Sequence, residues 1–312
     1  MTTRTARTIA ALLGGAAALA LAAPATATAA PTARPKITAQ QLVLAPTDRG
    51  YVGTLTATVT NPGSIATSVD LLVTEPAGAS FTTIEPGGPC LYDRLVENRL
   101  VTDCYGQRIE ARGSVTFQLG FHVWTTARAY PMVAQGGEIS VLPTGASKAT
   151  DTARFTTLFE STTGSLHNPR AYVQATKTDL SIRGSAVQLT RQADGSLLGR
   201  MPVTVRYGND APSFHLDVEA ALPAGVAVHH IEPQDMPSFP DWFTVPGGRF
   251  MPGEERTVDV ILSAPAGTPA GTLGTGSYTV GASYFYGSGA PVPDVDLADN
   301  TVSFPVTAVE AS

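Results

Sequence analysis

The sequence contains an internal repeat, and this repeat constrains the fold more than any other feature. Pro76-Ala77-Gly78 followed by Ile84-Glu85-Pro86 returns as Pro223-Ala224-Gly225 followed by Ile231-Glu232-Pro233, with the same internal spacing. Two triplets that recur in the same order and at the same spacing are not expected by chance. Since self-similarity at a fixed distance is the signature of duplicated structural units, the chain is predicted to contain two diverged copies of one domain.

The segments around each motif alternate with a period of two residues. Apolar side chains largely alternate with polar or small ones in Val69–Val73 and again in Thr257–Leu262, which is typical of half-buried antiparallel strands. About seven or eight such segments per copy suit a β-sandwich. Turn signals such as Asn61-Pro62-Gly63 separate them. No long amphipathic helix is indicated, and Leu91–Leu100 is expected to hold a helical turn at most.

Composition agrees with a chain rich in strands and turns, because Gly (30) and Pro (24) are plentiful and only 15% of residues are charged. The predicted fold class is all-β, with two tandem immunoglobulin-like antiparallel β-sandwich domains at residues 36–160 and 170–309. The polar segment 161–169 is the predicted linker. Because it is short, we expect limited hinge motion between two domains that fold separately.

The N-terminus has the parts of a secretory signal peptide. Arg4 and Arg7 give a positive region, residues 9–21 form a short apolar run, and small-x-small cleavage sites lie at residues 25–29. Residues 1–30 are therefore predicted to be removed, by a Sec-type route because the arginines are not adjacent. An uncleaved anchor is the alternative. We expect a secreted, extracellular protein, either released or held to the envelope without a covalent anchor, with no transmembrane segment after signal removal.

Charge and motifs limit the functional classes. The net charge is −6 and nothing resembles the basic stripe that binds phosphate groups, so nucleic acid is not an expected partner. The sequence contains no Gly-x-Ser-x-Gly elbow, no His-Glu-x-x-His motif and no phosphate-binding loop. A non-enzymatic protein is predicted. A cryptic hydrolase, with titratable groups clustered in a cleft, is the enzymatic alternative.

Cys90 and Cys104 are the only cysteines. A signal peptide sends them to an oxidising compartment, where a disulfide between them is expected. Metal binding by the two thiolates is the rival, but no histidine or third cysteine lies nearby in sequence to complete a tetrahedral site. Redox catalysis would require a Cys-x-x-Cys spacing, which this pair lacks. The segment between the cysteines is highly charged, so a covalent clamp would compensate for its small apolar surface.

The segments Ala57–Gly63, Pro76–Gly78 and Gly113–Thr116, together with the two cysteines, resemble the conserved-repeat domains found in tandem in bacterial surface and secreted proteins, and the similar cell-adhesion-related domains. The second copy is similar through Leu297–Thr301, but it lacks both cysteines and has the aromatic segment Met236–Phe250 in their place. The preference for Ala, Thr and Arg resembles that of actinobacteria. The resemblance implies immunoglobulin-like sandwiches at the cell surface and specifies no activity.

Aromatic residues supply the candidate ligand-binding site. If exposed, they could stack on sugar rings or anchor a protein partner. The alternative is that the aromatic segment Met236–Phe250 folds down as an apolar plug over the end of the second sandwich. It would then lie at the position that the disulfide has in the first copy. The candidates are Phe239, Trp242, Phe243, Tyr284 and Tyr286, with Phe250 in the same crowded segment.

An acidic loop supplies the candidate metal site. Asp294, Asp296 and Asp299 offer the oxygen ligands that calcium prefers. The alternative is a polar turn in which these side chains cap their own backbone. We expect a weak calcium site at most, and no other cofactor. His229 and His230 are adjacent on an expected strand, so they point to opposite faces and do not suit one shared ion.

The function that the sequence favours is a secreted, non-enzymatic structural or interaction module of the cell envelope or extracellular space, with an envelope protein or glycan as partner. The alternative is a carbohydrate-binding or surface-polymer-binding protein that uses the aromatic segment of the second domain.

Overall fold

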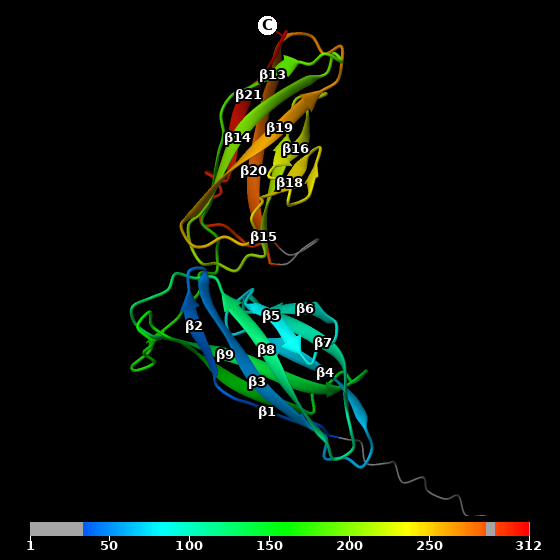
Figure 1. Cartoon of the computed structure of the whole chain (residues 1–312), viewed down its shortest axis with the longest axis vertical. Helices are drawn as coiled ribbons and strands as arrows, with labels where there is room; N and C mark the ends of the chain where they lie inside the picture. The colour runs from blue at the N-terminus through cyan, green and yellow to red at the C-terminus, as the bar shows by residue number, and fades with distance from the viewer. Residues whose placement is uncertain (1–33, 285–290, 312) are drawn as a thin grey trace, which may run out of the picture. The chain divides into compact units, whose positions relative to one another are not determined.

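The computed structural model describes residues 34–284 and 291–311, and β-strands dominate it (Figure 1). The predicted signal peptide lies outside the described residues. Within the described ranges the chain forms two large mixed sheets and no α-helix, which confirms the all-β class. The same ranges therefore hold no helix of the length and apolarity that a membrane crossing requires.

The first sheet is formed by the N-terminal half of the chain, coloured blue to green in Figure 1. Its strands are β1 (Lys36–Ala39), β2 (Leu42–Thr47), β3 (Gly50–Thr60), β4 (Thr67–Thr74), β5 (Phe81–Glu85), β6 (Cys90–Val96), β7 (Arg99–Ile109), β8 (Ser114–Val123), β9 (Met132–Pro143), β10 (Asp151–Phe159) and β11 (Arg170–Ala171). Their order is β5-β8-β3-β2-β10-β9-β4-β7-β6, with β1 on β3 and β11 on β9.

Strand β2 joins the two halves of this sheet. Residues Leu42–Leu44 pair in parallel with β10, whereas Ala45–Thr47 pair antiparallel with β3. The sheet consequently closes around one apolar core, to which strands from both halves contribute. Its largest fully buried side chains are Tyr51, Phe117, Phe121 and Phe159.

The second sheet is formed by the C-terminal half of the chain. Its strands are β12 (Leu180–Arg183), β13 (Val187–Arg191), β14 (Leu197–Tyr207), β15 (His215–Ala221), β16 (Ala227–Glu232), β17 (Ser238–Phe239), β18 (Trp242–Thr244), β19 (Glu254–Ala264), β20 (Gly271–Ser283) and β21 (Thr301–Val309). Their order is β16-β19-β14-β13-β21-β20-β15-β18-β17, with β12 on β14. Tyr207, Phe243, Tyr278 and Phe304 lie in its core.

The two strand orders correspond position by position. Strands β5, β8, β3 and β2 occupy the places that β16, β19, β14 and β13 have in the second sheet, and β10, β9, β4, β7 and β6 match β21, β20, β15, β18 and β17. The Ile-Glu-Pro motif ends β5 in one sheet and β16 in the other, and its Glu–Pro bond is cis in both. The hairpin β6–β7 therefore has its counterpart in β17–β18.

The hairpin β6–β7 contains the predicted disulfide. Cys90 lies opposite Cys104 in the strand register, and the two sulfur atoms are bonded. Glu97 and Asn98 form the turn with positive φ angles, a conformation that two-residue hairpin loops favour. The helical turn expected over Leu91–Leu100 is absent, because this segment pairs with β7 as a strand.

The predicted linker folds as a structured turn. Ser161 is fully buried, and its hydroxyl accepts hydrogen bonds from the backbone N–H groups of Thr163 and Ser165. Strand β11 follows it and pairs in parallel with β9 of the first sheet. Thr178 then forms an isolated bridge with Asp294, in the loop that precedes β21. The domain boundaries at 160 and 170 remain predictions.

Reduction of the disulfide is expected to destabilise the protein by about 3 kcal/mol, since an open chain regains the entropy that a closed loop of this size loses. Thermal unfolding with and without reductant measures this, and the expected drop in Tm is on the order of 10 °C. The double variant Cys90→Ala/Cys104→Ala is the control and should unfold at the reduced temperature whether or not reductant is present. Two thiols that react with an alkylating reagent before reduction would contradict the bridge.

Candidate functional site

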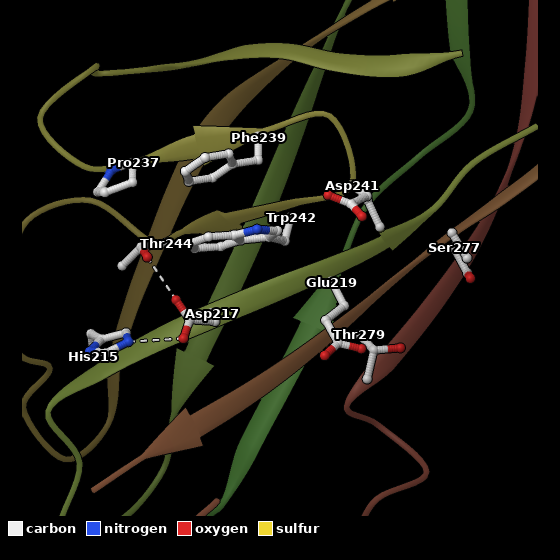
Figure 2. A pocket seen from close by; sticks show the side chains of 12 residues that line it. His215, Asp217, Glu219, Pro237, Phe239, Asp241, Trp242, Thr244, Ser277 and Thr279 are labelled. Carbon is white, nitrogen blue, oxygen red and sulfur yellow. Dashed lines mark hydrogen bonds and ion pairs between the residues drawn. The ribbon is translucent and has the colours of Figure 1, made fainter. Parts of the chain in front are cut away.

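A pocket of about 760 Å³ lies over strands β15, β17, β18 and β20 of the second sheet (Figure 2). The alternating direction of the side chains along β15 produces the floor of the pocket. His215, Asp217 and Glu219 line the pocket, whereas the intervening Leu216 and Val218 belong to the apolar core. Because successive strand residues point to opposite faces, one strand contributes to both.

Two stacked aromatic rings form one wall of the pocket. Phe239 and Trp242 face each other across the short hairpin β17–β18, with ring centroids 4.5 Å apart and an interplanar angle of 17°. Phe239 is 47% exposed, and Trp242 is half-buried. Figure 2 shows Trp242 between Phe239 and the side chains of β15. One face of the indole is thus covered by Phe239, and the other borders the pocket.

Asp217 is held in a fixed orientation at the floor. The Thr244 hydroxyl donates to its Oδ1 at 2.7 Å, and Nε2 of His215 lies 2.9 Å from its Oδ2. His215 is only 7% exposed. The neighbouring rows of the sheet place Glu219 opposite both Trp242 and Thr279. The pocket therefore combines a carboxylate held by two partners with an exposed acidic side chain beside the indole.

The charge of the pocket is negative. The residues that line it within the described chain include the carboxylates of Asp217, Glu219 and Asp241 but no lysine or arginine. Ser277 and Thr279 of β20 add hydroxyl groups. Glu219 and Asp241 are exposed. An aromatic face beside fixed polar groups can hold a ligand that is apolar on one side and has hydrogen-bonding groups at its edge.

The structure separates the aromatic residues that the sequence grouped together. Phe239 and Trp242 line the pocket, whereas Phe243 has no exposed surface and Phe250 is 3% exposed, both in the core. Phe243 points inward because it follows Trp242 on the same strand. The segment is therefore part plug and part pocket wall, and a ligand in the pocket would not contact Phe243.

The two tyrosines lie elsewhere. Tyr284 is 3% exposed and belongs to the core of the second sheet, so it offers no surface for stacking on a ligand. Burial raises the pKa of its hydroxyl. Tyr286 falls outside the described residues.

The acidic loop caps backbone groups. Oδ2 of Asp294 accepts hydrogen bonds from the Thr178 hydroxyl at 2.8 Å and from the Leu180 N–H at 3.0 Å, and its Oδ1 accepts from the N–H of Asp296 at 2.9 Å. Asp296 in turn accepts from the N–H of Ala298. Asp299 contributes its backbone carbonyl, which accepts from Ile182. This pattern fits the polar-turn alternative. Across residues 34–284 and 291–311, no group of three or more His, Cys, Asp or Glu is arranged to hold a metal ion.

Sequence reasoning missed the floor of the pocket. His215, Asp217 and Glu219 alternate with apolar residues, and that pattern is typical of any strand with one face in solvent. Asp241 lies between Phe239 and Trp242 in the sequence and had the only local signal, an acidic side chain beside candidate stacking residues. Thr244 gave no signal, because its role depends on a cross-strand neighbour.

Comparisons with known proteins identify no family. No protein-family model matches the chain, and no curated protein matches it. A transglutaminase from red sea bream matches at 10% identity and a TM-score of 0.23, over 89% of this chain and 32% of the transglutaminase, so the match spans about a third of that protein. The adhesin CfaE of enterotoxigenic E. coli matches at 11% identity over 89% of this chain and 87% of its own, with a TM-score of 0.25. The N-terminal domain of PorA matches at 12% identity over 39% and 96%, with a TM-score of 0.25. These similarities are too low to assign a function.

Calcium is expected to leave the thermal stability unchanged, because the carboxylates of Asp294 and Asp296 already accept backbone hydrogen bonds. Asp294→Ala is expected to cost about 1–3 kcal/mol, since the Leu180 N–H loses its partner. Thermal unfolding in chelated and calcium-containing buffer measures both effects. A rise in Tm with calcium that Asp294→Ala abolishes would show that the loop is a metal site.

Proposed function

We propose that this protein is a secreted, non-enzymatic module of the cell envelope or extracellular space that binds a carbohydrate or another surface polymer in the pocket of the second sheet. The observation that carries the proposal is the stacked pair Phe239–Trp242 beside the fixed carboxylate of Asp217. Sugar rings present C–H groups on their faces and hydroxyl groups at their edges. The aromatic rings can contact the C–H groups, and the carboxylate can accept hydrogen bonds from the hydroxyl groups.

The dimensions and character of the pocket support a glycan. A cavity of about 760 Å³ falls within the range of ordinary small-ligand sites and would hold a short stretch of an oligosaccharide. Its carboxylates and the hydroxyls of Ser277 and Thr279 are hydrogen-bonding partners for sugar hydroxyls. The indole of Trp242 is rigid and amphipathic, so it supplies contact area at a low entropic cost.

The domain architecture that goes with this function is a tandem pair of immunoglobulin-like sandwiches at residues 36–160 and 170–309. The repeated Pro-Ala-Gly and Ile-Glu-Pro motifs and the matching strand orders support a duplicated unit. Each sheet surrounds a core cluster made mostly of its own residues, and Leu100 of β7 is the exception that belongs to the cluster of the second sheet. In this proposal the first copy is the structural module and the second copy is the binding module.

The disulfide supports the proposed location, because such bonds persist in oxidising compartments.

We propose that the pocket has no catalytic activity because two of its carboxyl groups are exposed to solvent. A glycoside hydrolase needs one carboxyl group that stays protonated near neutral pH, and burial is the usual means. Glu219 and Asp241 are exposed and lack that environment, so the pocket is better suited to binding than to cleavage.

A second candidate function is the docking of a protein partner on the edge strand β6. Leu91 is 60% exposed, and Tyr92 and Val96 are each 38% exposed. Strand β6 ends the strand order of the first sheet, and an apolar edge strand can pair with a strand of another chain. This candidate predicts binding that depends on Leu91 and is indifferent to Trp242.

Trp242→Ala is expected to abolish retention of the protein on insoluble polysaccharides and cell-wall preparations, because it removes the wall of the pocket. Trp124→Ala is the matched control. Trp124 is the other of the two tryptophans in the chain. It is also half-buried, and its ring stacks on that of His122 with the ring centroids 3.8 Å apart. It lies in the first half of the chain, outside the pocket, so its loss should leave retention intact.

The measurement is a co-sedimentation assay with the folded full-length mature protein, its fold checked by thermal unfolding. Equal retention of both tryptophan variants would contradict the assignment of the pocket as the binding site. Absence of retention on every polysaccharide would contradict glycan binding itself. Release of reducing sugar from a bound polysaccharide would show that the protein is an enzyme.

A further inference from the structure

The pocket of the second sheet has an unbalanced charge. Of its three carboxylates, only Asp217 is engaged by the side chains of Thr244 and His215. The side chains of Glu219 and Asp241 make no hydrogen bond or ion pair among the described residues, although both line the pocket. Two unpaired negative charges in one concave surface favour a ligand with positive charge and disfavour an anionic one.

The aromatic wall favours the same sign of charge. The face of an indole ring is negative, so it attracts a cation held over it, and more strongly where water is excluded. Trp242 borders the pocket on the side away from Phe239, and its strand partner is Glu219 (Figure 2). A cationic group in this position would contact the ring face and a carboxylate at once.

The hydroxyl groups of the floor indicate that the pocket recognises more of its ligand than the charge. Ser277 and Thr279 lie on β20 beside Glu219, and Thr279 also exchanges a hydrogen bond with Thr301 at 2.9 Å. Such groups suit the edge hydroxyls of a sugar ring. A ligand that satisfies the indole, the carboxylates and the hydroxyls together is a sugar with an amino group.

We propose that the pocket selects glycans whose sugars carry protonated amino groups, that is, polymers of amino sugars without their N-acetyl groups, over neutral and acidic glycans. This inference rests on the proposed function and narrows it to one ligand class. The ammonium group pairs with Glu219 and Asp241, and the ring stacks on Trp242.

The test compares two oligosaccharides that differ only in N-acetylation, the neutral hexamer of N-acetylglucosamine and the fully deacetylated, cationic hexamer of glucosamine. Titration calorimetry is performed with the full-length mature protein at a mildly acidic pH, at which the amines are protonated and ordinary carboxyls are ionised. The deacetylated hexamer is expected to bind about tenfold more tightly or better. Because the preference is electrostatic, it should shrink as salt is added.

Variants assign the preference to the two unpaired carboxylates. Glu219→Gln and Asp241→Asn keep the shape of each side chain and remove its charge, and each is expected to weaken binding of the deacetylated hexamer about threefold or more. Binding of the N-acetylated hexamer should change little. Asp48→Asn, at an exposed position in the turn between β2 and β3 of the first sheet, is the matched control and should change neither.

The outcomes separate this inference from the proposed function. Equal or tighter binding of the N-acetylated hexamer overturns the charge preference and leaves glycan binding in place. A preference that survives in both Glu219→Gln and Asp241→Asn overturns the role of these residues. Failure of both hexamers and of every polysaccharide overturns the proposed function together with this inference. Binding of a lysine-rich peptide in place of both sugars would make the occupant a protein segment and overturn it as well.

Discussion

The pairing of β18 with β15 is the interaction on which the pocket depends. Its register places Phe243 opposite Val218 and Trp242 opposite Glu219. Phe243 is fully buried and contacts the core ring of Tyr278 edge-on at 5.8 Å, so the hydrophobic effect fixes this short strand. A shift of one residue would bury Trp242 and expose Phe243. The same burial that stabilises the core therefore sets the orientation of the pocket wall.

The two edge hairpins are held to their sheets by different interactions. In the first sheet a disulfide ties β6 to β7, and Cys104 is buried against the core. The corresponding hairpin β17–β18 has no cysteine and is much shorter, and in it Phe243 supplies the burial while Phe239 and Trp242 stack outside. A short hairpin uncovers the outer face of β15 and β20. The short hairpin and the pocket therefore occur together in the second sheet, whereas the first sheet has the longer, disulfide-tied hairpin at the same place in its strand order.

Local sequence patterns predicted the all-β class and the aromatic segment, and the presence of only two cysteines behind a predicted signal peptide predicted the disulfide. These patterns did not predict which aromatic side chains line a surface, since that depends on register with a distant strand. Glu75 is a second example. A charged residue directly before Pro76 is typical of a solvated turn. Glu75 is nevertheless 1% exposed, and its carboxylate accepts hydrogen bonds from the N–H groups of Ala79, Phe81 and Leu100. Burial outweighs these donors and raises its pKa to about 7.

The central claim is that Trp242 contacts the ligand, and its fluorescence tests this most directly. The chain has two tryptophans, so Trp242 is the only indole in Trp124→Phe. Titration of this variant with the deacetylated glucosamine hexamer is predicted to shift or quench the emission in a saturable manner, whereas Trp242→Phe, with Trp124 as its only indole, should give a constant spectrum. A constant spectrum from Trp124→Phe while calorimetry shows binding would contradict the account.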